Sequence, residues 1–143
     1  GQNTFRMIKV NGVPKIFFNC IVQYLYSDHF YIGQQSIEFF LQLFIYADYF
    51  LIPRLQQICS RYIKTFVDQK NVLAVMLMSH AHNSQDLENF CIDFICLNEA
   101  EILKGKEWKV FLQITQSNQL DLFQYFVEKI IDYKKENFVQ HSL

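Results

Sequence analysis

The chain has little glycine and very little proline: four Gly and two Pro in 143 residues. Barrels and sandwiches built from many short strands need turn residues far more often, so this scarcity indicates a mainly helical fold. The net charge is −1, with basic and acidic residues interspersed. Domains that bind nucleic acid or anionic membranes are usually markedly basic. We therefore expect neither nucleic acid nor a membrane as a partner.

The sequence also lacks the short motifs that carry out chemistry. Its glycines, Gly1, Gly12, Gly33 and Gly105, form no loop that would cradle a phosphate or supply an oxyanion site. No pair of acidic residues lies in an apolar setting, as general acid and base catalysis would require. We therefore predict no catalytic residue, no cofactor and no enzymatic activity.

Cysteines are present, but without the short, regular spacing of a disulfide framework. Cys20, Cys59, Cys91 and Cys96 all lie inside apolar helical patterns, which is typical of buried free thiols in a reducing compartment. No signal or targeting peptide is visible. We expect a cytoplasmic protein, with the nucleus or the cytoskeleton as alternative locations.

A zinc site made of His80, His82, Cys91 and Cys96 is an alternative role for these residues. Closed zinc sites usually have two closely spaced pairs of ligands. Cys91 and Cys96 are five residues apart, so on a helix they diverge by roughly 140°. We therefore predict no metal site. Cys91 is assigned to the core, and the two histidines to a helix end, where the helix dipole favours imidazolium.

Apolar and aromatic side chains are abundant, at 51% and 17% of the residues. This is enough for a real core in one domain or in two small sub-domains. The densest apolar stretch, residues 17–67, is centred on residues 37–47, which are apolar on nearly every side of a helical wheel. Such a helix is either buried on all sides or spans a membrane, and a span needs about 20 apolar residues. Because this segment is shorter and contains Glu38, we predict that it is the central core helix of a soluble domain.

Apolar spacing, together with interruptions by proline, asparagine and serine, predicts the other elements. The long helices are expected at 15–27, at about 34–49 with Ser36 as a cap, at 53–66, at 70–82 with Asp68 as the N-cap, at 85–97 with Ser84 as a cap, and at 120–138. One helical turn is expected at 99–103, a short segment with Trp108 at 107–116, short strands at 5–10 and 30–32, and a frayed tail at 139–143. The predicted fold class is therefore mainly α (α+β).

Three segments, in this order, resemble a known family. The first combines Ile8-Lys9-Val10 and Gly12 with YLYSD at 24–28. The second combines LQLFIYAD at 41–48 with IPRLQQIC at 52–59, and the third combines Asn71-Val72-Leu73 with Asp86-Leu87 and residues 91–95. The series resembles the second half of a BTB/POZ domain followed by a BACK-type helical extension. The resemblance covers roughly residues 5–103, and it is the order of the segments that makes it specific.

The resemblance implies two domains, a C-terminal part of a BTB/POZ domain at 1–67 and a BACK-like helical extension at 68–143. The family's N-terminal half, with its domain-swapping strand and dimerisation helix, has no counterpart before Gly1, so we expect a longer parent protein. In some family members a Φ-x-Glu motif binds a cullin, and it lies just before the strand that matches residues 5–10 here. Gln2-Asn3-Thr4 does not supply this motif.

By resemblance, the chain is expected to be a protein–protein interaction module. The first hypothesis is a dimerising adaptor that recruits a cullin–RING ubiquitin ligase, with a cullin and either a second BTB chain or the missing N-terminal half as partners. The alternative is a structural scaffold subunit that uses the same fold inside a large assembly, such as a cytoskeletal one.

Tyr49-Phe50-Leu51 lies between two predicted helices and ahead of Pro53. Apolar residues are unusual at a loop tip unless something covers them. In BTB proteins that bind cullins, the matching loop and the tyrosine of the YxYxG-like element lie near the cullin. The resemblance therefore indicates Tyr26, Tyr49, Phe50 and Leu51 as partner-binding residues. The alternative is that they pack against the missing half-domain or the BACK-like helices.

Overall fold

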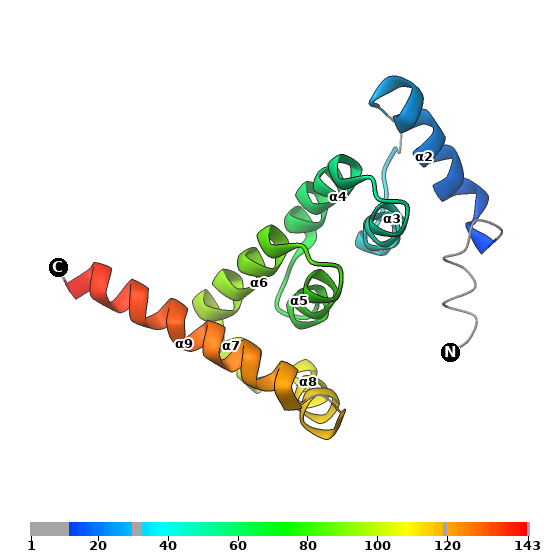
Figure 1. Ribbon diagram of the computed structural model, residues 1–143. Helices are drawn as coiled ribbons and strands as arrows, with labels where there is room; N and C mark the ends of the chain where they lie inside the picture. Colours follow the sequence, from blue (N-terminus) through cyan, green and yellow to red (C-terminus); the bar gives the residue numbers. More distant parts are fainter. Residues whose placement is uncertain (1–11, 30–32, 119, 143) are drawn as a thin grey trace. The chain divides into compact units, whose positions relative to one another are not determined.

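The computed structural model describes residues 12–29, 33–118 and 120–142. All eight elements in these ranges are α-helices, which confirms the mainly helical fold class (Figure 1). In order they are α2 (Lys15–Ser27), α3 (Ile37–Tyr49), α4 (Pro53–Phe66), α5 (Val72–Ala81), α6 (Gln85–Leu97), α7 (Glu99–Lys104), α8 (Lys106–Asn118) and α9 (Leu120–Ser142). The strands expected at 5–10 and 30–32 lie outside the described residues. The chain divides into two units, Gly1–Phe66 and Val67–Leu143.

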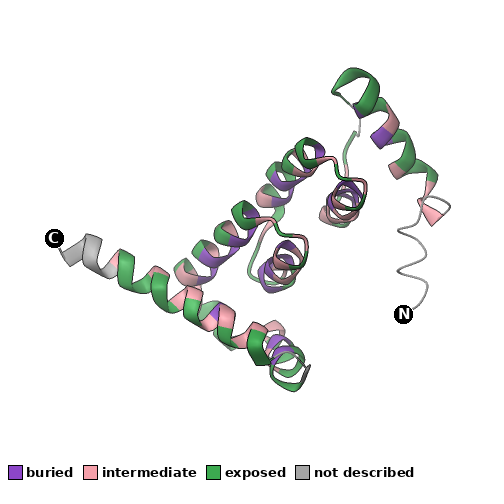
Figure 2. Ribbon diagram, viewed as in Figure 1, coloured by how far each residue is buried: buried purple, intermediate pink, exposed green. Residues whose placement is uncertain are grey.

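In the first unit, α3 packs along α4, and α2 joins α3. The predicted core segment is indeed the centre of this unit, because α3 contributes Leu43, Phe44 and Tyr46, which have no exposed surface. Helix α4 contributes Leu55, Cys59 and Ile63, also fully buried, at the three-to-four spacing of one helix face. Figure 2 shows buried residues on the sides where α3 and α4 face each other.

A run of aromatic rings connects the three helices of the first unit. Phe17 of α2 stacks on Phe39 of α3 with ring centroids 5.1 Å apart, and Phe39 meets Phe40 edge to face at 5.5 Å. Phe40 then stacks on Tyr62 of α4 at 4.6 Å. Such pairs contribute about 0.5–1.5 kcal/mol each beyond the area that they bury. The buried aromatic residues Phe39 and Phe40 therefore connect the core to rings near the surface, such as Tyr62, which is 43% exposed.

The helices predicted at 15–27 and 53–66 have these bounds in the structure. Pro53 is the first residue of α4, a position where its missing N–H costs nothing. The prediction for α3 was three residues too long, since α3 begins at Ile37 and not near Gln34. Ser36 does occupy the N-cap position, but its side chain makes no capping hydrogen bond.

The second unit is built on the pair α5–α6. Helix α9 packs on α6 and α8, and the short α7 links α6 to α8. Val72, Met76 and Ser79 of α5 and Leu87 and Cys91 of α6 are fully buried, on the sides where the two helices face each other (Figure 2). Phe111 of α8 and Phe126 of α9 close the core, with ring centroids 6.2 Å apart.

Three boundary predictions for this unit were wrong. Helix α5 begins at Val72 with Asn71 as its N-cap. Asp68 does accept hydrogen bonds from the N–H groups of Lys70 and Asn71, as an N-cap residue would, but these bonds cap the turn ahead of the helix. The segment expected at 107–116 is longer and spans 106–118. The last helix continues to Ser142, beyond the end expected near Phe138. Helix α6 has its predicted bounds, with Ser84 at the N-cap but without a side-chain capping bond.

Candidate protein-interaction site

The corner between α3 and α4 is a complete Schellman motif. The N–H of Ile52 donates to the carbonyl oxygen of Ala47 at 2.8 Å, and the N–H of Leu51 donates to that of Asp48 at 3.1 Å. These two bonds satisfy carbonyl groups that the end of a helix otherwise leaves without partners. The corner is therefore held in one backbone conformation by its own hydrogen bonds.

The residue at the left-handed position of this motif is Leu51, with φ = 58°. Glycine is the usual residue there because a Cβ atom clashes with the backbone, at a cost of about 1–2 kcal/mol. Burial does not compensate, because Leu51 is 84% exposed. The motif thus holds a large apolar side chain out in solvent at an energetic cost, an arrangement found more often at binding sites than in cores.

Of the other predicted partner-binding residues, Tyr49 and Phe50 lie at this corner, whereas Tyr26 lies apart from it. Tyr49 and Phe50 meet edge to face with ring centroids 5.0 Å apart. Tyr49 is 48% exposed and Phe50 is half-buried, so the structure brings Tyr49, Phe50 and Leu51 together as one apolar tip. Tyr26 lies on another element, in the last turn of α2, and is 90% exposed. None of the described rings stacks on it.

A second cluster, in the other unit, was not predicted from the sequence. Glu88 of α6 is 1% exposed, and its carboxylate accepts a hydrogen bond from the hydroxyl of Tyr125 of α9 at 2.7 Å. Nδ1 of His80 lies 2.7 Å from the other carboxylate oxygen, and Gln85 Nε2 donates at 3.0 Å. A buried carboxylate is costly unless it is fully hydrogen-bonded. The cluster meets this requirement with donors from three helices.

Aromatic contacts surround the same cluster. The His80 ring packs on Tyr125 at 4.6 Å and against Phe126 at 5.3 Å, and the Lys129 ammonium lies 5.5 Å above the Tyr125 ring. Burial, followed by the hydrogen bond and negative charge of Glu88, raises the pKa of Tyr125 to about 12. Tyr125 therefore remains a neutral donor. A cavity of about 270 Å³ adjoins the cluster and is also lined by Ser79 and Ser84. The Ser79 hydroxyl donates to the carbonyl oxygen of Met76 at 2.8 Å, and we assign the cluster a structural role.

The cysteines and histidines do not assemble a reactive site in the described part of the chain. All four thiols are free, with Cys20, Cys59 and Cys91 buried and Cys96 half-buried. Burial raises the pKa of Cys59 to about 12 and that of Cys96 to about 11, so neither is an activated thiolate. Within the described ranges no three His, Cys, Asp or Glu residues are grouped as metal ligands.

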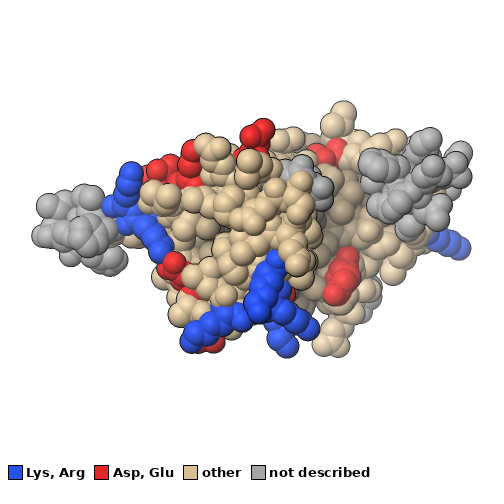
Figure 3. Space-filling model, turned by 90° about the horizontal axis from the view of Figure 1, so that it is seen from below, with Lys and Arg blue, Asp and Glu red and all other residues tan. Residues whose placement is uncertain are grey.

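On the face seen in Figure 3, several blue Lys or Arg side chains gather at the lower centre, with red acidic side chains close by. The net charge of the whole chain is −1. Among the described residues, no helix has the length and apolar character that crossing a bilayer requires.

Comparison with known proteins finds relatives of 21–28% identity. No family model matches the chain. It is 28% identical to a BTB/POZ domain-containing protein of Arabidopsis thaliana over 85 residues, which is 59% of the chain and 30% of that protein. It is 21% identical to Kelch repeat and BTB domain-containing protein 8 of Danio rerio over 142 residues, 99% of the chain and 22% of that protein. It is also 27% identical to Inhibitor of Bruton tyrosine kinase of Mus musculus over 113 residues, 78% of the chain and 8% of that protein.

These relatives support a BTB-like family for the chain and so agree with the BTB part of the resemblance that its motifs indicated. They also support the coarse functional class, a BTB-type protein that interacts with other proteins. The aligned region spans from 8% to 30% of the length of these relatives.

Proposed function

We propose that the chain is the interaction module of a BTB–BACK protein and that the corner between α3 and α4 binds a partner protein. In this proposal, residues 1–67 are the C-terminal part of a BTB/POZ domain and residues 68–143 a BACK-like extension. The observation that carries the proposal is Leu51, an 84% exposed leucine held at φ = 58°. The chain tolerates this strain at a corner where a glycine would be free of it.

The tip has the properties of a binding hot spot. Most of the energy of a protein interface comes from a few apolar and aromatic anchors that become fully buried on binding. Leu51 projects between helices whose backbone is fixed, and Phe50 and Tyr49 pack against each other beside it. Because the backbone of the corner is already held by its hydrogen bonds, little backbone entropy is lost when a partner covers it.

The partner proposed is a cullin, which makes the chain an adaptor of a cullin–RING ubiquitin ligase. The support is the resemblance of this corner, and of the YLYSD segment with Tyr26, to the elements that lie near the cullin in cullin-binding BTB proteins. The proposal includes a second BTB chain as the dimerisation partner. Tyr26 is assigned to the rim of the surface, because it lies on α2 and is 90% exposed.

Pull-down and titration with a purified cullin N-terminal domain test this proposal. We expect the full chain to bind, and Leu51→Ala and Phe50→Ala to weaken binding by about tenfold or more, the size of effect that a hot-spot residue gives. Leu97→Ala is the matched control, because Leu97 is also a leucine with high exposure, 77%, but lies on α6.

Circular dichroism checks that each variant is folded. If the chain does not bind the cullin while a known BTB adaptor does, the adaptor role is wrong. If it binds but none of the tip variants weakens binding, the cullin contacts another surface and the assignment of the corner is wrong.

A further inference from the structure

Two cavities in the second unit join into one groove along α5 and α8. The larger, of about 820 Å³, is lined by Leu77 and Met78 of α5, Ile114 of α8 and Leu122 of α9. The smaller, of about 240 Å³, is again lined by Leu77 and Ile114. Because both cavities are lined by Leu77 and Ile114, they adjoin along the two helices, and the larger one is in the size range of ligand pockets.

The groove is apolar and open to solvent. Val110 and Ile114 lie one turn apart on α8, face the groove, and are 51% and 45% exposed. Leu73 and Ala74 of α5 line the same part of the groove. These side chains form an apolar stripe along two helices, and an apolar stripe of this kind is the surface to which the apolar face of another helix docks.

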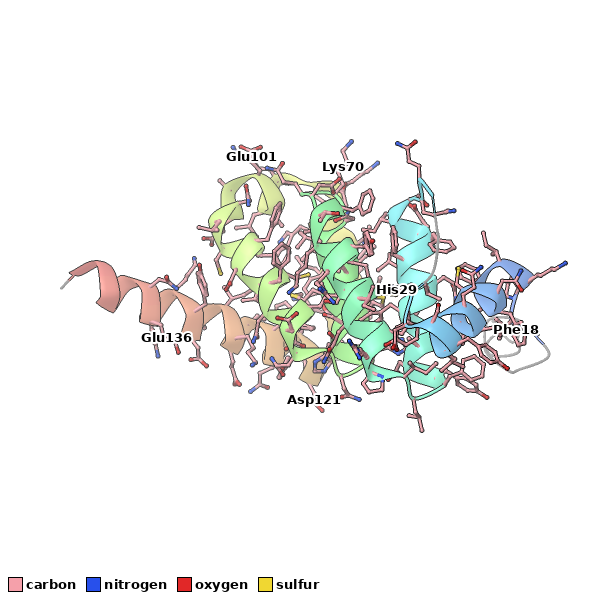
Figure 4. All side chains as sticks on the ribbon, turned by 90° about the horizontal axis from the view of Figure 1, so that it is seen from above. Phe18, His29, Lys70, Glu101, Asp121 and Glu136 are labelled. Atoms are coloured by element: carbon pink, nitrogen blue, oxygen red, sulfur yellow. The ribbon has the colours of Figure 1, made fainter. Side chains whose placement is uncertain are left out.

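The two ends of the groove differ in charge. Lys70 and Lys106, together with Glu107, line the end where α5 and α8 begin. Asp121 and His80 line the end where these helices finish. Figure 4 shows Lys70 and Asp121 at opposite ends of this unit. The dipoles of α5 and α8 point the same way, because both helices begin at the lysine end, which makes that end more positive.

We infer that this groove binds an amphipathic helix of a partner protein, with an acidic C-terminal turn placed at Lys70 and Lys106. The charges set the direction, because the negative end of the bound helix then meets the lysines and its positive end meets Asp121. Helix α5 has ten residues, or about 15 Å, which matches about three turns of a partner with apolar anchors at i, i+4 and i+7.

This inference goes beyond the proposed function, because it assigns a second binding surface in another unit of the chain. Neither the α3–α4 corner nor a cullin enters the argument. Loss of one surface by mutation is therefore expected to leave binding at the other unchanged.

The sole tryptophan provides a probe. Trp108 stacks on Phe111 with ring centroids 5.4 Å apart, and Phe111 lines the groove. We would titrate the full chain with a synthetic amphipathic helical peptide that has leucines at i, i+4 and i+7 and glutamates in its last turn, and follow tryptophan fluorescence. A second peptide of the same composition has the glutamates in its first turn.

We expect the first peptide to bind at least tenfold more tightly than the second, and Ile114→Glu to weaken its binding at least tenfold. Val110→Glu provides a second, more exposed variant, and Leu97→Glu, on α6 and away from the groove, is the control. Equal binding of the two peptides, binding of neither, or unchanged affinity in both groove variants overturns the inference. Sedimentation would also overturn it if the wild type is a dimer and Ile114→Glu a monomer, because a second copy of the chain then covers the groove.

Discussion

Leu51 and Asn83 hold the same position in two equivalent helix–helix corners. Each is the left-handed residue of a Schellman motif, with φ of 58° and 57°. In the second corner, the N–H of Ser84 donates to the carbonyl oxygen of Ser79 at 2.8 Å, and the N–H of Asn83 donates to that of His80 at 3.2 Å. This is the same pattern as at Leu51. Asparagine adopts this conformation at a lower energetic cost than leucine. The two corners can therefore be compared to measure how much free energy the left-handed conformation of Leu51 costs.

Leu51→Gly is predicted to make the chain more stable and a weaker binder. Glycine removes the Cβ clash of about 1–2 kcal/mol but increases the entropy of the unfolded chain by about 0.4–1 kcal/mol, so the net gain is about 0.5–1 kcal/mol. Little burial is lost, because Leu51 is 84% exposed. Urea unfolding monitored by circular dichroism measures the change as a higher midpoint.

Asn83→Gly is the matched control for that prediction. Because asparagine already accommodates positive φ, the free energy of unfolding is expected to change by less than about 0.5 kcal/mol. A Leu51→Gly variant that is less stable than the wild type would contradict the prediction, since it would mean that the leucine side chain packs against the chain.

Removal of the Tyr125 hydroxyl is predicted to destabilise the second unit. Tyr125→Phe deletes the 2.7 Å hydrogen bond to the buried Glu88 carboxylate, and a hydrogen bond to a charged group contributes about 1.5–3 kcal/mol. Glu88→Gln is expected to cost a similar amount, because the amide replaces one acceptor oxygen with a donor that faces other donors. Denaturant unfolding of the full chain measures both changes.

The exposed pair on the same helix provides the control. Gln124 Nε2 donates to Glu128 Oε1 at 3.0 Å in solvent, so Glu128→Gln should change stability by less than about 0.5 kcal/mol. Equal effects of Glu128→Gln and Glu88→Gln would show that burial of Glu88 does not matter and would refute the assigned role.

The sequence predicted the helices well wherever apolar spacing and a specific stop signal coincide. Pro53 and the apolar face of 53–66 gave both bounds of α4. Asp68 does make capping hydrogen bonds, but to Lys70 and Asn71 in the turn ahead of α5 and not to the first turn of the helix itself. The choice between these two uses of an aspartate depends on backbone geometry, which residue type alone does not determine.

The candidate site was predictable only in part. The apolar tip at 49–51 was found because apolar residues ahead of a proline are unusual in a loop, but nothing in the sequence indicated that Leu51 is left-handed. Glu88 was missed because a glutamate in the first turn of a helix normally lies in solvent and favours the helix dipole. Its partners His80 and Tyr125 are 8 and 37 residues away in sequence, and only the packing of α5, α6 and α9 brings them together.

The cysteines are predicted to react slowly and in a definite order. The thiolate is the reactive form, and burial raises the pKa of Cys59 to about 12 and that of Cys96 to about 11. Cys96 is half-buried and Cys59 has no exposed surface. Alkylation with iodoacetamide, followed by peptide mass spectrometry, should modify Cys96 first and Cys59 last. Cys96→Ser should remove the first phase, whereas modification of all four at the rate of the urea-unfolded chain would contradict the prediction.

Stability is predicted to fall at alkaline pH through Tyr125. Its hydroxyl has a pKa raised from 10.0 to about 12 by burial and by Glu88, so the folded state favours the neutral form. This contribution is complete below the pKa of the unfolded chain, and it is lost as the pH rises from 10.0 to about 12. The advantage of the wild type over Tyr125→Phe in urea unfolding should therefore shrink across this interval and remain constant below it. A constant difference across the interval would mean that Tyr125 does not donate to Glu88.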